Sequence, residues 1–157
     1  MRTIETRVYE FTELSDSAKD KARGWYREHA LDYDWWEGTY EDAANIGLKL
    51  TGFELDSNRH ATGHFTEDAI DVAEAVIKEH GENCETHKTA KAYLSDIGRF
   101  EKEGEREAFA SEFERSLLDD YSIMLQKECE YLLSDEAVDE SILANGYTFT
   151  ETGKRFG

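Results

Sequence analysis

Three residues between positions 80 and 87 are of the types that serve as zinc ligands in proteins. His80, Cys84 and His87 follow one another at intervals of four and three residues, and a thiolate with imidazole nitrogens is a donor set that zinc prefers. His60 and His64 precede them in the chain. The spacings match no standard zinc finger, no CxxC pair occurs, and His80 also continues an apolar helix pattern. We therefore expect no metal and no cofactor, and keep a metal-binding or hydrolytic site at these five residues as an alternative.

Common catalytic motifs are missing from the sequence. The chain has no GxSxG nucleophile turn, no glycine-rich phosphate loop and no HExxH metalloprotease motif. Carboxylates are so numerous that pairs of them occur by chance anywhere along the chain. A hydrolase that combines Asp or Glu with His60 or His64 stays open, but nothing in the sequence selects it. We expect no catalytic residues and no enzymatic activity.

The strongest chemical signal is the surplus of carboxylates. The 157 residues include 36 Asp and Glu against 18 Lys and Arg, a formal net charge of −18. Such acidity is typical of disordered tails, but here 39% of residues are hydrophobic and 12% are aromatic, which is enough to form a core. A negative charge of this size attracts basic surfaces and repels nucleic acid and anionic lipid. The sequence therefore predicts a folded protein with a basic partner, without direct binding to nucleic acid or membranes.

The acids gather into two windows that contain no Lys or Arg. Spread evenly over a domain of this mass, the net charge would be about one per 450 Å², whereas B-DNA carries one per roughly 100 Å². Imitation of DNA therefore needs clustering, and residues 30–48 hold five acids while residues 128–153 hold seven. The candidate partner-binding residues are Asp32, Tyr33, Asp34, Trp35, Glu37, Glu41, Asp42, Glu128, Glu130, Asp135, Glu136, Asp139 and Glu140.

Aromatic side chains accompany the first acidic window. Trp and Tyr dominate binding energies at interfaces, and an acidic rim would orient an Arg-rich partner. Two adjacent tryptophans cannot face the same side of a helix, so we assign Trp36 to the core and place Trp35, with Tyr33, nearer the surface. The alternatives are that both tryptophans are buried at a helix–sheet seam, and that both windows are solvated helix faces that keep the protein soluble.

Hydrophobic periodicity predicts the elements that must position these residues. A period of two indicates strands at residues 2–11 and 147–150 and a hairpin over residues 53–65. Spacings of three and four indicate helices at residues 16–30, 34–50, 66–80, 84–98, 105–133 and 134–143. Ser15 and Ser134 are expected helix N-caps, and Gly146 ends the last helix. The prediction is a single α+β domain, residues 1–157, with a small antiparallel sheet of about four strands packed by several helices, including one long C-terminal helix.

Location and self-association also follow from the sequence. Two cysteines are too few for a disulfide scaffold and fit a reducing compartment, and no apolar run reaches the length of a membrane span. We therefore expect a cytoplasmic protein. On the long helix, Leu118, Tyr121, Leu125 and Cys129 form a second apolar line. That line suggests a possible homodimer, although a helix packed on two sides needs two apolar stripes as well.

Four phrases give the chain a family resemblance. They are VYEFTELS at residues 8–15, followed by Ala18 and Lys19, then DYDWW at 32–36, CETHKTAK at 84–91 and YTFTETGK at 147–154. Together they resemble a family of small acidic proteins of bacteriophages and prophages, and the likeness covers nearly the whole chain. The phrases contain no catalytic motif, so no site residues are carried over. The resemblance implies an accessory role in an infected bacterium, such as anti-CRISPR or anti-restriction activity, in which acidic proteins imitate nucleic acid.

These observations lead to one functional hypothesis and one further alternative. We expect a phage-encoded acidic protein, in the cytoplasm of the infected host, that inhibits a defence nuclease or CRISPR complex by occupying its nucleic-acid-binding surface. The further alternative, beside the metal-binding or hydrolytic enzyme, is an antitoxin-like protein that neutralises one basic protein.

Overall fold

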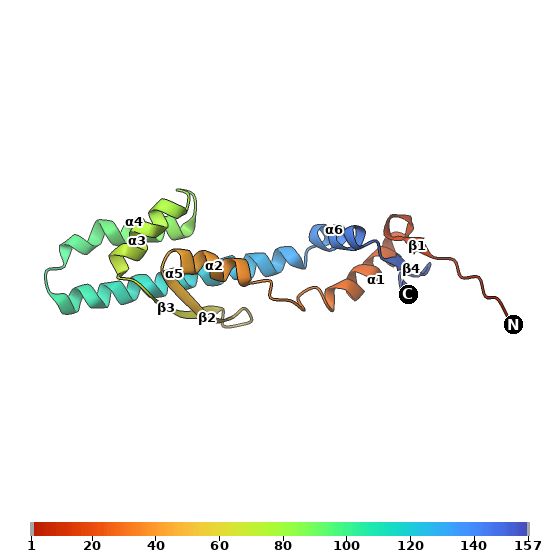
Figure 1. The fold of residues 1–157 in the computed structure, drawn as a ribbon, viewed down its shortest axis with the longest axis horizontal. Helices are drawn as coiled ribbons and strands as arrows, with labels where there is room; N and C mark the ends of the chain where they lie inside the picture. Colours follow the sequence, from red (N-terminus) through yellow and green to blue (C-terminus); the bar gives the residue numbers. More distant parts are fainter. Residues whose placement is uncertain (1, 157) are drawn as a thin grey trace. The chain divides into compact units, whose positions relative to one another are not determined.

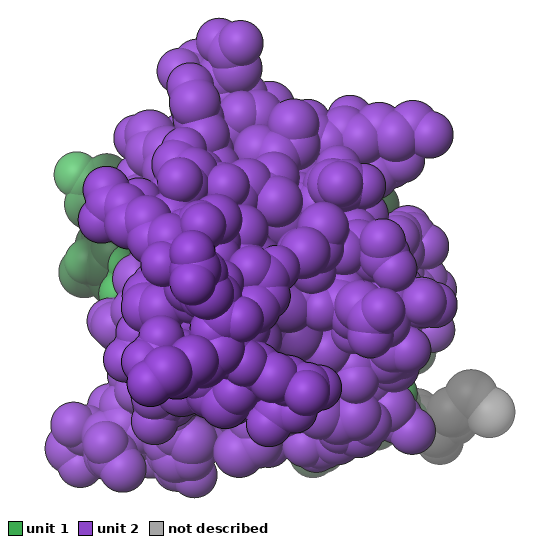
Figure 2. Space-filling view, turned by 90° about the vertical axis from the view of Figure 1, so that its left-hand side faces the viewer, with its two compact units in different colours: residues 1–35, 128–157 green, residues 36–127 purple. Residues whose placement is uncertain are grey.

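Six α-helices and five short strands form residues 2–156, the part of the chain that the computed structural model describes. The strands are antiparallel and divide into a two-stranded and a three-stranded sheet. The predicted α+β class is confirmed, although its single sheet of about four strands is replaced by two smaller ones. The chain separates into two compact units, coloured separately in Figure 2: the central unit, residues 36–127, and the terminal unit, residues 1–35 and 128–157.

The central unit consists of a β-hairpin and helices (Figure 1). Its strands β2 (Leu48–Glu54) and β3 (His60–Phe65) pair in antiparallel fashion, with a bulge between Leu50 and Gly52. The elements are α2 (Glu37–Asn45), β2 (Leu48–Glu54), β3 (His60–Phe65), α3 (Ala69–Glu79), α4 (Glu85–Asp96) and α5 (Glu103–Leu132). The last residues of α5, from 128 onward, belong to the terminal unit.

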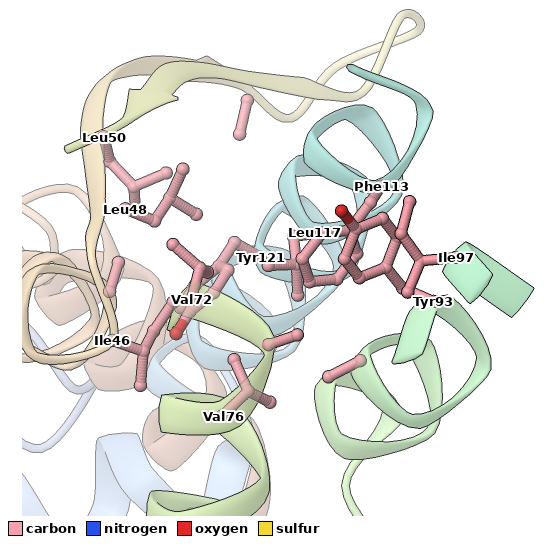
Figure 3. Packing of buried hydrophobic residues seen from close by; sticks show 14 residues of the cluster. Ile46, Leu48, Leu50, Val72, Val76, Tyr93, Ile97, Phe113, Leu117 and Tyr121 are labelled. Carbon is pink, nitrogen blue, oxygen red and sulfur yellow. The ribbon is translucent and has the colours of Figure 1, made fainter. Parts of the chain in front are cut away.

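The hairpin, α3, α4 and α5 share one apolar core in the central unit (Figure 3). Aromatic rings fill its centre, where the ring of Tyr93 stacks on that of Phe113 with centroids 4.4 Å apart. Offset stacking of this kind adds to the hydrophobic gain of burial. The labelled side chains of the cluster are Ile46, Leu48, Leu50, Val72, Val76, Tyr93, Ile97, Phe113, Leu117 and Tyr121.

The terminal unit combines two helices with a short three-stranded sheet. Its elements are β1 (Tyr9–Glu10), α1 (Asp16–Arg27), α6 (Asp135–Asn145), β4 (Thr148–Phe149) and β5 (Arg155–Phe156). The strand order is β1-β4-β5, with Tyr9 opposite Phe149. Its core includes Phe11, Ala22, Val138, Ile142 and Phe149.

Helix ends in the terminal unit follow the predicted capping residues. The Ser15 side chain accepts a hydrogen bond from the Ala18 amide, and the Ser134 side chain accepts one from the Ala137 amide. Gly146 terminates α6 in the left-handed conformation. These three predictions are confirmed because capping depends on nearby residues alone.

Three predicted elements are wrong in extent, one of them the hairpin, which begins at Leu48 instead of residue 53. The first strand covers only Tyr9–Glu10 instead of residues 2–11, and Ile4 is 78% exposed. Alternation of polar and apolar residues is not sufficient to form a strand where no partner strand pairs with it. The second helix begins at Glu37 and ends at Asn45 instead of spanning 34–50. Gly47 has a φ of +88° and lies at the turn between α2 and β2. Leu48 and Leu50 then belong to β2, where they are buried in the core.

The structure also bears on two other expectations, that no segment spans a membrane and that α5 pairs two chains. Within residues 2–156, no helix is both long and apolar enough to cross a bilayer. On α5, Tyr121 and Leu125 are fully buried within the chain. These two residues of the second apolar line therefore pack inside the chain and are not available to a second copy. The homodimer remains a prediction, and this line no longer supports it.

Gly153 supplies a test of packing in the terminal unit. Its φ is +91°, and a Cβ built on it would lie 2.1 Å from the Ala18 carbonyl oxygen. We expect Gly153→Ala to lower the free energy of unfolding by at least about 1 kcal/mol, because both the backbone strain and the clash act in the same direction. Urea unfolding followed by circular dichroism measures the change.

The matched control is Gly24→Ala in α1, where a Cβ meets nothing within 4 Å. Alanine favours a helix over glycine by up to about 1 kcal/mol, so this variant should be at least as stable as the parent. Equal effects of the two substitutions would contradict the packing described for Gly153.

Candidate functional site

Most carboxylates of the chain take no part in ion pairs within the fold. Among residues 2–156, six of the 36 Asp and Glu residues pair with Lys or Arg and two more, Asp32 and Asp42, lie beside a His, which leaves 28 outside such pairs. The negative charge is therefore displayed on the surface and does little to hold the fold together.

Helix α2 presents two acids of the first window to solvent. Glu37 and Glu41 are both exposed and lie four residues apart, so they share one face of the helix. The opposite side of α2 contributes Ala43 to the core and packs Tyr40 against it. At the start of the helix, the Trp36 ring meets the Phe53 ring edge-on at 5.7 Å. The core thus fixes α2 so that its two glutamates face outward.

Asp42, the next acid of the window, has a different environment. Its carboxylate accepts a hydrogen bond of 2.7 Å from the Tyr121 hydroxyl and lies 3.0 Å from the His80 Nε2. Burial, and then the bond to Asp42, raises the pKa of Tyr121. Because Asp42 already has two partners inside the central unit, we leave it out of the proposed binding surface.

The remaining residues of the first window belong to the terminal unit. Asp32, Tyr33 and Asp34 are exposed, with 56% of Tyr33 accessible, whereas Trp35 is half-buried. Asp32 lies 2.9 Å from the His29 Nδ1. The structure thus places Tyr33 and Asp34 at the surface as expected, and divides the first window between the two units. The expected difference between the two tryptophans is wrong, because Trp35 and Trp36 are both half-buried.

Two arginines lie among the acids of the second window. Arg23 binds Asp139 through two hydrogen bonds of 2.7 and 2.9 Å, and Arg27 pairs with Asp135. The bond from Arg27 lowers the pKa of Asp135, and the bond to Asp139 is the main cause that raises the pKa of Arg23. The second window contains no Lys or Arg in the sequence, but in the fold Arg23 and Arg27 lie next to its acids. Its exposed acids outside ion pairs are Glu128, Glu130, Glu136, Glu140 and Glu151, of which the first four are candidate partner-binding residues.

Sequence analysis missed these two pairs because the partners lie 116 and 108 residues apart. One signal was present in the chain. Arg23 and Arg27 are four residues apart on α1, so they form a basic face on that helix. A basic helix face in so acidic a chain indicates an acidic helix as its internal partner.

The five residues of the alternative metal site are not gathered by the fold. His60 and His64 are exposed on β3, and the His60 Nδ1 lies 2.7 Å from the Asn58 carbonyl oxygen. The His87 Nδ1 lies 3.0 Å from the carbonyl oxygen of His80. Among residues 2–156, no three His, Cys, Asp or Glu side chains are placed to hold one metal ion. A metal centre built from these five residues is therefore not supported.

His80 and Cys84 do share one cavity of the central unit, which we call the His80 pocket. It has a volume of about 380 Å³, and its lining includes Asp42, His80, Cys84, Thr86, Asp120 and Met124. Asp120 accepts a hydrogen bond of 2.6 Å from the Thr89 hydroxyl. Burial raises the pKa of Asp120, and the nearby charges of Asp119 and Glu85 raise it further against the opposing effect of Thr89. The pocket thus holds a carboxylate whose charge is poorly compensated.

Comparison with protein-family models, with curated proteins and with solved structures gives no match for this chain. Any function therefore has to be argued from the residues and their geometry.

The environment of Asp120 predicts a pH dependence. A carboxyl whose pKa is higher in the folded than in the unfolded chain destabilises the fold when it is charged, and this cost disappears as the pH falls and the carboxyl is protonated. Asp120→Asn keeps an acceptor for Thr89 without the charge. We expect this variant to be more stable than the parent at pH 7, with a difference that shrinks toward pH 4. Urea unfolding at several pH values measures it.

Glu107→Gln, at an exposed position of the same helix, is the matched control. It removes the same charge without the burial and should show a smaller change with pH. A parent protein that is more stable than Asp120→Asn at pH 7 would contradict the interpretation.

Proposed function

We propose that this chain is an acidic binding protein that covers the basic surface with which another protein holds nucleic acid. The observation that supports this most strongly is the set of 28 carboxylates outside the ion pairs of residues 2–156, most of which are exposed on the folded units. A disordered acidic tail would have to lose chain entropy on binding. Acids on a preformed helix avoid that cost.

Glu37 and Glu41 are the proposed contact residues in the central unit. Both are exposed, and their shared helix face holds their carboxylates at a fixed spacing. Arg and Lys side chains that bind phosphates also bind carboxylates, and the paired N–H groups of Arg fit a carboxylate with two hydrogen bonds. A nucleic-acid-binding surface therefore has the chemistry to recognise this face, and while it is occupied it cannot hold DNA or RNA.

In the terminal unit, the proposed contact residues are Asp32, Tyr33 and Asp34. Exposed tyrosine between two acids offers apolar contact area with a polar tip, the combination that contributes most to interface energies. Asp135 and Asp139 are excluded because Arg27 and Arg23 neutralise them. The exposed acids Glu128, Glu130, Glu136 and Glu140 stay in the proposal.

The resemblance to phage proteins suggests the biological setting. In that setting the partner is a host defence nuclease or a CRISPR complex, and the chain acts in the cytoplasm of the infected bacterium. No relative from the comparisons bears on this part of the proposal. An antitoxin-like neutraliser would use the same electrostatics and differ only in the identity of the basic protein.

Charge reversal on α2 tests the proposed surface. The intact chain is immobilised, proteins captured from a bacterial lysate are identified, and the purified partner is loaded with a fluorescent DNA duplex. The chain should displace the duplex, and displacement should weaken steeply as salt rises. We expect Glu37→Lys with Glu41→Lys to weaken displacement at least about 10-fold, because like charges would then face each other.

Glu103→Lys with Glu107→Lys is the matched control. These glutamates are also exposed, four residues apart and on one helix, so the change of net charge is the same. The control should displace the duplex more effectively than the α2 variant. Partners that bind no nucleic acid, or that hold the chain and the duplex together, would contradict the proposed function, and equal loss in both variants would contradict the α2 assignment.

A further inference from the structure

A hydroxyl, an imidazole and a carboxylate are connected in the central unit. The Thr86 Oγ1 lies 2.6 Å from the His80 Nδ1, and the His80 Nε2 lies 3.0 Å from one Asp42 oxygen and 3.2 Å from the other. The Tyr121 hydroxyl donates to Asp42 at 2.7 Å. Asp42 comes from α2, His80 ends α3, Thr86 is in the first turn of α4, and Tyr121 is on α5. Four helices therefore contribute to this chain of hydrogen bonds, Thr86–His80–Asp42–Tyr121, which we call the relay.

The carboxylate fixes the direction of the relay. An ionised carboxylate can only accept hydrogen bonds, so the Nε2 of His80 carries the proton that faces Asp42. The Nδ1 of the neutral ring then has a free lone pair and accepts from the Thr86 hydroxyl. This is the arrangement in which an imidazole removes a proton from a hydroxyl nucleophile while a carboxylate orients it.

The relay lies against a cavity. Thr86, His80 and Asp42 all line the His80 pocket. Thr86 is 2% exposed and the His80 side chain 8%, so both are almost completely buried where they line the pocket. Cys84 is the N-cap residue of the 12-residue helix α4 and makes no side-chain cap hydrogen bond. The first backbone N–H groups of α4, at Glu85 and Thr86, are therefore left for an anionic oxygen.

We propose that the His80 pocket is an acyl-transfer site in which Thr86 is the nucleophile, His80 the general base and Asp42 the residue that positions His80. The proposal goes beyond the binding function and does not depend on it. It replaces the five-residue His and Cys site considered from the sequence with a site that shares only His80 and the pocket-lining Cys84.

The reaction balances without a cofactor. The Thr86 oxygen forms a bond to the carbonyl carbon while its proton moves to the His80 Nδ1, and the carbonyl oxygen gains negative charge at the N-terminus of α4. The bond from the carbonyl carbon to the leaving alcohol or thiol breaks, and that group takes the proton from His80. Water then attacks the acyl-Thr86 ester and gives a proton to His80. The carboxylic acid leaves, and the Thr86 oxygen recovers the proton.

The lining of the pocket indicates the substrate class. Ile123 and Met124 provide an apolar wall for a short acyl chain. Asp120, Glu85 and Asp42 add negative charge, which outnumbers the one positive charge of Lys127 in the same lining, and burial raises the pKa of Asp120. A cationic leaving group would be favoured near these carboxylates. The expected substrates are therefore small esters or thioesters that carry an ammonium group.

The test uses butyrylthiocholine, a thioester with a quaternary ammonium group, and the intact chain. Release of the thiol is followed by absorbance, and the butyryl adduct is located by fragment mass spectrometry. We expect thiol release above the buffer rate and an adduct on Thr86. Thr86→Val, which keeps the shape of the buried side chain, and His80→Asn should each lower the rate at least about 100-fold. Asp42→Asn should lower kcat more than it changes KM.

Conservative and matched variants separate chemistry from folding. Thr86→Ser keeps a hydroxyl and should release thiol faster than Thr86→Val does. His64→Asn removes an exposed histidine of β3 and should leave the rate unchanged. Thermal unfolding by circular dichroism confirms that each variant is folded. No release above buffer by the folded parent protein, an adduct on Cys84, or equal rates in Thr86→Val and the parent protein would each overturn the proposal.

Discussion

Repulsion among surplus carboxylates is the constraint on which this structure depends. With a net charge of −18 and 28 acids outside the ion pairs of residues 2–156, each unit must be held by apolar contacts. The central unit meets this with stacked rings such as Tyr93 on Phe113, and the terminal unit with edge-on contacts such as Trp25 on Tyr147 at 5.1 Å. Most of these acids are exposed, and the exposed ones are then available to a partner.

The few acids that the fold does use are held by specific donors. Asp139 has Arg23, and Asp42 has Tyr121 and His80. Asp42 is the most consequential of these because it connects α2 to α5 and at the same time sets the proton position on His80. One carboxylate of the acidic window, that of half-buried Asp42, thus belongs to an internal hydrogen-bond network, while its neighbours Glu37 and Glu41 face solvent. The two proposals rest on this division between held and exposed carboxylates.

Features that depend on nearby residues were predictable from the sequence. Helix positions followed from apolar spacing, and the caps at Ser15, Ser134 and Gly146 followed from local chemistry. The strand predicted at residues 2–11 was too long because a strand exists only where a partner strand pairs with it, and β4 offers Tyr9 and Glu10 only two residues. Alternation of side chains carries no information about that partner.

Contacts between distant segments decided the candidate site and were hidden from the sequence. His80 was visible as a possible ligand or base, but Asp42 lies 38 residues before it, and neither periodicity nor motif joins them. The acids of residues 128–153 looked free of bases because Arg23 and Arg27 reach Asp139 and Asp135 from more than 100 residues away. The sequence therefore predicted that the surface is acidic, but not which of the acidic residues are outside ion pairs.

Salt dependence of stability tests the claim of uncompensated charge most directly. Raising sodium chloride from 10 mM to 500 mM shortens the screening length from about 30 Å to a few ångström and weakens interactions among exposed charges. If most carboxylates repel one another, the free energy of unfolding measured with urea at pH 7 should rise over this range. A fall would show that attractive ion pairs dominate, and would contradict the claim that the surplus carboxylates are uncompensated.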